Sequence, residues 1–239
     1  MSAEPLPVQA STPRENRFLW LSYVGPFALY LILTQFPPLY PDSYAWTYPA
    51  VVVVVGAATV AFLHGKQILR PHRHVAVGIA AGVVGIALWI FLSRLHLERS
   101  LFAWLPEAFQ PKARAGFDPF TRIADPSARW GFVGFRLAGL VLVVPVAEEL
   151  FWRGFLLRWL ISPNWQELRL GQFSWFSFAG VVVLFTLAHP EWFAAAVYCA
   201  LLNGLMIWKR DLWNCVVAHA ISNLILAVYI LSTQNWELW

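Results

Sequence analysis

Two adjacent glutamates, Glu148 and Glu149, lie inside a long apolar stretch, LVLVVPVAEELFWRGFLLRWL at residues 140–160. A charged side chain near the centre of a bilayer costs about 2.5–3.5 kcal/mol on insertion scales, so there must be a chemical reason to keep both. Arg153 follows Glu149 by four residues, which puts the two on one helical face where they can pair. Glu148 is rotated by about 100° from Glu149 on the same helix. An ion pair therefore accounts for Glu149 and leaves Glu148 for another task.

Two further apolar stretches each carry a histidine with a helical neighbour. The segment FTLAH places Phe185 and His189 four residues apart, and HAISN places His219 and Asn223 four apart. Taken singly, a buried histidine or asparagine can serve helix packing alone. Ionisable groups within a membrane, however, usually face a cavity and one another. We therefore expect both histidines and Asn223 to share one cavity with Glu148.

The chemistry that suits this set of groups is activation of water. A desolvated glutamate is a stronger proton acceptor than one in water and can serve as a general base. One imidazole could hold the same water, while the other imidazole and the Asn223 amide could stabilise a developing oxyanion. No serine or cysteine stands beside a base, so direct attack by water is the simpler interpretation. As an alternative, Glu148, His189 and His219 could be three zinc ligands with water as the fourth, although no HExxH segment is present.

The composition identifies the environment of these groups. Of the 239 residues, 59% are hydrophobic and 13% charged, and the mean hydropathy is +0.58. Soluble domains carry about 25% charged residues, so we predict an integral membrane protein. The net charge of +4 is small and its cations lie between apolar runs, which argues against binding of nucleic acid. Cys199 and Cys215 form no disulfide framework.

The apolar runs predict an all-α fold, a polytopic integral membrane helical bundle of about seven to eight transmembrane helices. We expect residues 1–17 to form a disordered tail and residues 18–239 a single membrane domain. The run at 132–160 is too long for one straight crossing and predicts a tilted or broken helix, or an interfacial helix followed by a span, with a kink at Pro145. Arg136 is expected to snorkel to the interface and Asn203 to serve helix packing. A modest excess of cations favours a cytoplasmic N-terminus. The expected spans are 18–36, 48–63, 75–93, 132–160, 174–190, 192–208 and 213–232.

The segments EELFWR, FTLAH and HAISN match, in order, the motifs EExxxR, FxxxH and HxxxN. In these motifs the chain resembles the CPBP intramembrane proteases, the CAAX-processing and bacteriocin-processing enzymes also called the Abi family. The resemblance covers residues 132–232. The stretches HPEW (189–192) and LWNCVVAHAISNLILAVYIL (212–231) are similar to the exosortase-associated, CAAX-protease-related branch.

This resemblance implies a membrane endopeptidase that cleaves near a chain terminus. By motif position, Glu148 would activate water together with His189, and His219 and Asn223 would stabilise the oxyanion. The remaining motif positions would support the site, namely Glu149, Arg153 and Phe185.

The resemblance also implies the surroundings of the enzyme. Its partners would be membrane lipid and a protein or peptide substrate, C-terminal and lipid-anchored or exosortase-linked, and it would reside in a bacterial inner membrane. No cofactor is expected, with zinc as the open alternative. Two other functions fit the same fold: a non-catalytic scaffold or immunity factor, which would have no reason to keep Glu148, and a small transporter. The lack of an inverted sequence repeat argues against a transporter.

Overall fold

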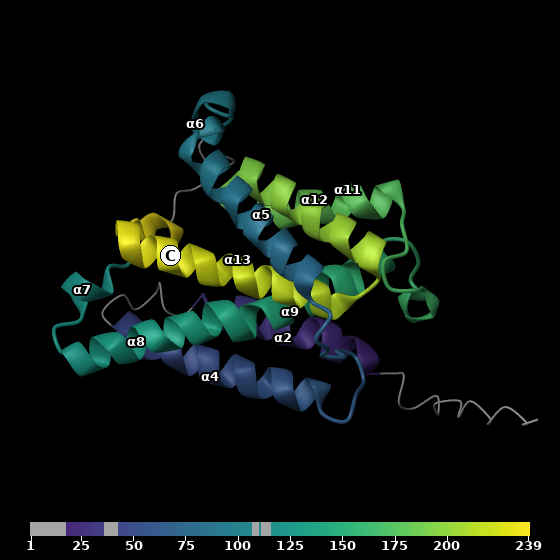
Figure 1. Ribbon diagram of the computed structural model, residues 1–239, viewed down its shortest axis with the longest axis horizontal. Coiled ribbons are helices and arrows are strands. Elements are labelled where there is room, and N and C mark those ends of the chain that lie inside the picture. The colour runs from purple at the N-terminus through teal and green to yellow at the C-terminus, as the bar shows by residue number, and fades with distance from the viewer. Residues whose placement is uncertain (1–17, 36–42, 107–109, 111–115) are drawn as a thin grey trace, which may run out of the picture.

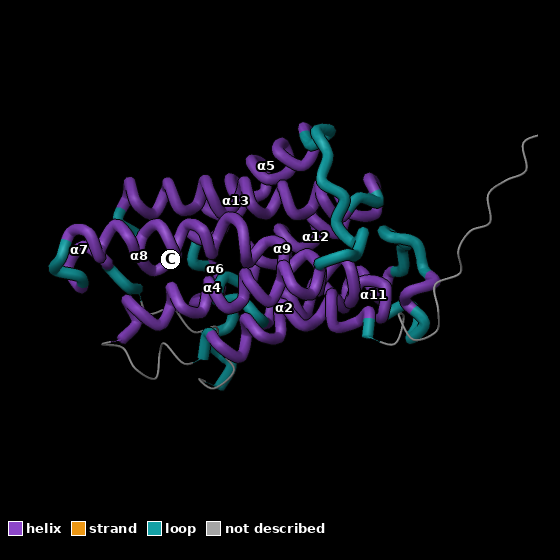
Figure 2. The backbone as a smooth tube through the Cα atoms, turned by 90° about the horizontal axis from the view of Figure 1, so that it is seen from below, coloured by secondary structure: helices purple, strands orange, loops and turns teal. Residues whose placement is uncertain are grey.

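The computed structural model describes residues 18–35, 43–106, 110 and 116–239, and the tail expected at residues 1–17 lies outside this part. Every regular element within the described residues is helical, so the predicted all-α fold class is confirmed (Figures 1 and 2). The main helices are α2 (Leu19–Leu33), α4 (Tyr44–Leu63), α5 (Ala76–Arg94), a composite helix over 126–159, α11 (Trp175–Leu187), α12 (Trp192–Lys209) and α13 (Leu212–Thr233). Short elements join them: α6 (Leu97–Leu101), α7 (Pro119–Arg122), η5 (Trp165–Glu167) and η6 (Trp236–Leu238).

Each of the seven predicted spans corresponds to one of these helices. Within the described residues, five are long and apolar enough to cross a membrane, whereas α2 and α11 have 15 and 13 residues. At a rise of about 1.5 Å per residue the two short helices extend about 22 and 20 Å, less than the roughly 30 Å of a hydrocarbon core. Large apolar side chains such as Val60 and Leu142 are 69% and 66% exposed. Such side chains facing outward fit a helical bundle embedded in lipid.

The composite helix shows how the long apolar run at 132–160 is folded. Its 34 residues form one helical stretch made of α8 (Pro126–Ala138), η3 (Gly139–Val143), α9 (Val144–Glu149), η4 (Leu150–Leu156) and α10 (Leu157–Trp159). The segments η3 and η4 are π-helical, an arrangement that often occurs at functional sites. Pro145 lies in the first turn of α9, directly after η3. The interruption therefore takes the form of two π segments on either side of the glutamates.

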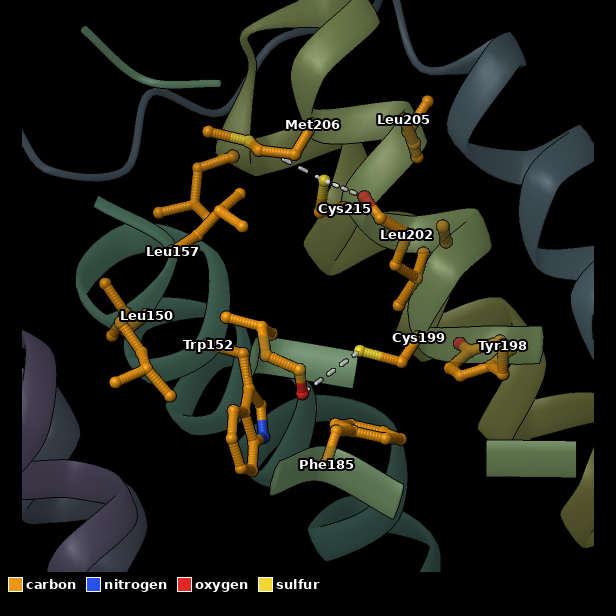
Figure 3. Packing of buried hydrophobic residues seen from close by; sticks show 14 of the residues in the cluster. Leu150, Trp152, Leu157, Phe185, Tyr198, Cys199, Leu202, Leu205, Met206 and Cys215 are labelled. Carbon is orange, nitrogen blue, oxygen red and sulfur yellow. Dashed lines mark hydrogen bonds between the residues drawn. The ribbon is translucent and has the colours of Figure 1, made fainter. Parts of the chain in front are cut away.

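Close helix packing holds the site-bearing helices in place. In Figure 1, α5 crosses α13 and α12, while α2 and α4 pack along the composite helix. A Cβ atom at Gly82 of α5 would lie 2.5 Å from the carbonyl oxygen of Ala218, so glycine permits this approach next to His219. Figure 3 shows the adjoining core, where Trp152 of η4, Phe185 of α11 and Cys199 of α12 come together.

Candidate active site

A cavity of about 360 Å³ opens among α2, α5, the composite helix and α11 to α13. The four side chains expected to converge, Glu148, His189, His219 and Asn223, all line it. Phe185 also contributes to its wall. We call this space the Glu148 cavity. The motif residues thus meet in space, while the catalytic role of each remains a prediction.

The predicted ion pair between Glu149 and Arg153 is present. Arg153 Nη1 donates to Glu149 Oε1 at 3.0 Å, and both side chains are fully buried. The other guanidinium nitrogens reach α12, where Nε donates to Asn203 Oδ1 at 3.2 Å and Nη2 lies 3.4 Å from the Cys199 carbonyl oxygen. Asn203, expected to serve packing, thus supplies an acceptor. Arg153 joins the composite helix to α12 and neutralises Glu149.

His219 bonds to the same glutamate, a contact that helical spacing did not indicate. Its Nδ1 lies 2.8 Å from Glu149 Oε1. Because a carboxylate accepts hydrogen bonds, Nδ1 carries the proton, and Nε2 of the neutral ring is then an acceptor. A neutral His219 therefore cannot donate to an oxyanion through Nε2. It could do so only as an imidazolium.

His189 has the same tautomer for a firmer reason. Its Nδ1 lies 2.8 Å from the carbonyl oxygen of Phe185, and a carbonyl can only accept. Nε2 of the neutral ring is again the acceptor nitrogen. The ring stacks on Phe185 with centroids 4.3 Å apart and meets Trp89 edge-on at 5.7 Å. His189 follows the end of α11 at Leu187 and lines the cavity.

Glu148 differs from its neighbour in lining the cavity and in having no cationic partner among the described residues. The residue is 8% exposed, and within the described part of the chain its Oε2 is buried without a hydrogen bond. Trp152, one helical turn later, lies near this carboxylate, and its own indole N–H makes no bond of normal geometry. The structure therefore places one carboxylate in an ion pair and the adjacent one in the cavity wall with unused acceptor capacity.

Asn223 is already engaged in part. Its Nδ2 donates to the carbonyl oxygen of Leu140, in the π segment η3, at 2.8 Å. A carboxamide has two N–H groups, so one remains for a ligand.

Two cavity residues were not found from the sequence. Arg136, expected to snorkel to the interface, instead lines the cavity, where its Nη1 donates to the Tyr44 hydroxyl at 3.1 Å and its guanidinium lies 4.4 Å from the Tyr48 ring. These two tyrosines hold it in the wall, and among the described residues no carboxylate pairs with it. Tyr198 also lines the cavity, and its buried hydroxyl has no partner within the same residues. In the sequence, Tyr198 could not be distinguished from an aromatic residue that only packs in the core.

The zinc alternative can be compared with this arrangement. Among the described residues, no three His, Cys, Asp or Glu side chains lie close enough together to hold a metal ion. Glu148, His189 and His219 in this conformation therefore do not fit a zinc site. Metal dependence itself remains a prediction.

A second cavity, of about 550 Å³, lies at the other end of α2. Leu19 and Tyr23, near the start of α2, line it, whereas Tyr30 and Thr34, near its end, line the Glu148 cavity. We call it the basic cavity because its charged lining residues are Lys66, Arg70, Arg158, Arg210 and a single acid, Asp211. The two cavities therefore lie toward opposite ends of the bundle.

Comparison with known protein families gives a match over the three motifs. The model of a family described as Rce1-like, type II CAAX prenyl endopeptidase, matches residues 130–225. This range includes all seven residues that were singled out by motif. The predicted resemblance to CAAX-processing enzymes is confirmed, whereas the exosortase-associated branch stays a prediction. No curated protein and no solved structure matches the chain.

Proposed function

We propose that this protein is an intramembrane endopeptidase in which Glu148 activates water, and the match of residues 130–225 to the Rce1-like family model supports this proposal. The observation that carries this proposal is the contrast between the two glutamates. Glu149 is neutralised by Arg153 and does not line the cavity, whereas Glu148 lines the cavity and has no ion-pair partner among the described residues. A scaffold would need the Glu149 carboxylate for folding but would have no use for an unpaired carboxylate at Glu148.

In the proposed reaction, Glu148 and the acceptor nitrogen Nε2 of His189 hold the attacking water. Glu148 takes one proton as the water oxygen bonds to the scissile carbonyl carbon, and the carbonyl oxygen becomes an oxyanion. Glu148 then returns the proton to the leaving nitrogen as the C–N bond breaks. The products are a new carboxyl group and a new amine, so atoms and charge balance without a covalent enzyme intermediate.

Two of the motif residues are proposed to face the oxyanion. Asn223 would donate its second N–H, since the first is held by Leu140. His219 would donate only when its ring is protonated, and the buried Glu149 carboxylate at 2.8 Å would stabilise that cation. Arg153 and Asn203 fix the position of Glu149 and thereby the orientation of the imidazole.

We further propose that the substrate is the C-terminal segment of a membrane-associated protein, which fits lipid-anchored and exosortase-linked substrates alike. Arg136 supports this proposal because it is a cation in the cavity wall with no carboxylate partner among the described residues, and a substrate α-carboxylate would pair with it. Arg136 precedes Glu148 by 12 residues, or roughly 18 Å of helix. After allowing for the two side chains, about three to five extended residues would span the remaining distance.

The test uses purified protein in nanodiscs and quenched fluorescent peptides carrying a lipidated cysteine near a free C-terminus. Glu148→Gln keeps the size of the side chain but removes the base, so cleavage should fall about 10²–10⁴-fold while folding is retained. Glu167→Gln, at an exposed glutamate outside the cavity, is the matched control. Full activity of Glu148→Gln would contradict the mechanism, and peptide binding without cleavage by the wild type would indicate a scaffold. Loss of activity with a chelator and its recovery with Zn²⁺ would establish the metal alternative.

A further inference from the structure

The oxyanion described above is short of hydrogen-bond donors. His189 and His219 each carry the ring proton on Nδ1, which is bonded to the Phe185 carbonyl and to Glu149. Asn223 gives one of its two N–H groups to Leu140. A tetrahedral intermediate in a dry cavity is stabilised by donors that already point at the developing charge. The motif residues in this arrangement offer one neutral N–H without any change of protonation.

Tyr198 carries an O–H group that no described residue uses. It lies on α12, is 4% exposed and lines the Glu148 cavity. Its hydroxyl is buried and makes no hydrogen bond of normal geometry. Ser222 is a neighbouring hydroxyl whose own proton goes to the carbonyls of Gly82 and Ala218 at 2.9 and 3.0 Å; its oxygen could accept from Tyr198, but the two groups do not meet at hydrogen-bonding geometry. A buried hydroxyl without a partner is costly, and a ligand that accepts its hydrogen bond would remove that cost.

The ring that carries this hydroxyl is tightly held. It meets His219 edge-on with centroids 5.9 Å apart and meets Trp89 edge-on at 5.7 Å. On its other side it lies against Gly85 of α5, where a Cβ atom would come within 2.7 Å of the ring carbon Cε2. The glycine thus makes room for the ring, and the two aromatic contacts fix its plane. A donor held in this way costs little reorganisation when charge develops.

From these observations we propose that Tyr198 is a catalytic residue whose hydroxyl donates a hydrogen bond to the oxyanion of the tetrahedral intermediate. The inference rests on the proposed endopeptidase function. It adds a neutral donor that needs no extra proton, beside the second N–H of Asn223 and a His219 that must be protonated to donate. It also gives a use for a phenol at a buried position where phenylalanine would pack without an unsatisfied group.

Tyr198→Phe gives opposite expectations for activity and stability. Loss of one oxyanion donor should lower kcat about 10²–10³-fold with KM nearly unchanged. The melting temperature should stay the same or rise, because an unpaired buried hydroxyl has been removed. Tyr229→Phe is the matched control, because the Tyr229 hydroxyl accepts a bond from Arg94 at 2.8 Å and does not line the cavity. That variant should keep its kcat and lose some stability.

A second replacement guards against a packing effect. Incorporation of 3-fluorotyrosine at position 198 keeps the hydroxyl and should retain activity that phenylalanine loses. The proposal is overturned if Tyr198→Phe cleaves at the wild-type rate, or if the phenylalanine and fluorotyrosine proteins are equally impaired with lower melting temperatures. If the wild type cleaves, Glu148→Gln does not and Tyr198→Phe does, the proposed function stands and the Tyr198 inference alone fails. If the wild type cleaves no peptide, the proposed function fails first.

Discussion

Arg153→Ala tests how strongly the buried ion pair holds the bundle together. The substitution removes the 3.0 Å partner of Glu149 and leaves that carboxylate fully buried. Breaking a buried pair from one side costs about 3–5 kcal/mol, since the remaining charge is uncompensated. His219 Nδ1, 2.8 Å away, still donates a hydrogen bond to the carboxylate, which moves our expectation to the lower end of that range. By the scaling for chains of about this length, a cost of about 3 kcal/mol should lower the melting temperature by about 6–12 °C.

The assay is thermal unfolding in detergent micelles, followed by the fluorescence of the 14 tryptophans. The control is the double variant Glu149→Gln with Arg153→Met, which removes both charges and leaves no lone carboxylate. Because the cost lies in the unpaired charge, the double variant should be more stable than Arg153→Ala. An Arg153→Ala protein that melts at the wild-type temperature, or a double variant less stable than it, would refute the reasoning.

The remaining predictions concern other parts of the fold. Asp211 caps α13 by accepting from the Trp213 amide, so Asp211→Ala should cost about 0.5–2 kcal/mol in thermal melts at neutral pH. Burial alone would raise the pKa of Asp211, but hydrogen bonds from its neighbours outweigh the effect of burial and place the pKa below the ordinary 3.8. The stabilisation that the Asp211 carboxylate provides should therefore be complete above pH 3.8 and disappear as the pH falls through the lowered pKa. Gly85→Ala should displace the Tyr198 ring and lower both kcat and melting temperature, whereas Gly204→Ala, inside α12 with open space around its Cβ, should leave kcat unchanged and keep or raise the melting temperature. Arg136→Gln should raise KM for peptides with a free C-terminus and leave unchanged the KM for amidated peptides, and equal effects on both would contradict the substrate proposal.

The positions of the helices could be predicted because lipid imposes a simple rule. A span needs about 20 apolar residues, and runs of that kind are visible in the sequence. The Glu149–Arg153 contact was also predictable, since a spacing of four residues fixes it within one helix. Both inferences use information that is local along the chain. For the same reason, the three motifs could be assigned to one cavity only on the general expectation that intramembrane polar groups gather together.

What the sequence could not predict are contacts between helices. The bond from His219 to Glu149 joins residues 70 apart, and it decides which ring nitrogen faces the cavity. Arg136 was expected at the interface because lipid was taken as its neighbour, whereas Tyr44, 92 residues away, holds it in the wall. The sequence around Tyr198 did not indicate a functional role, because the pattern of an apolar helix does not show whether a tyrosine hydroxyl on it has a hydrogen-bond partner. Such features depend on the packing of whole helices.

The π segment η3 decides where the chain between Arg136 and Glu148 can lose a residue. A π turn accommodates one residue more than an α turn, and Gly139–Val143 forms such a turn between these two cavity residues. Deleting one residue there would let the segment close into ordinary α-helix with little change in the direction that Arg136 faces. A deletion within the α-helical turn that begins at Val144 would instead rotate Arg136 by about 100° relative to Glu148 and move it out of the wall. The place of a single-residue deletion therefore determines whether substrate anchoring stays aligned with water activation.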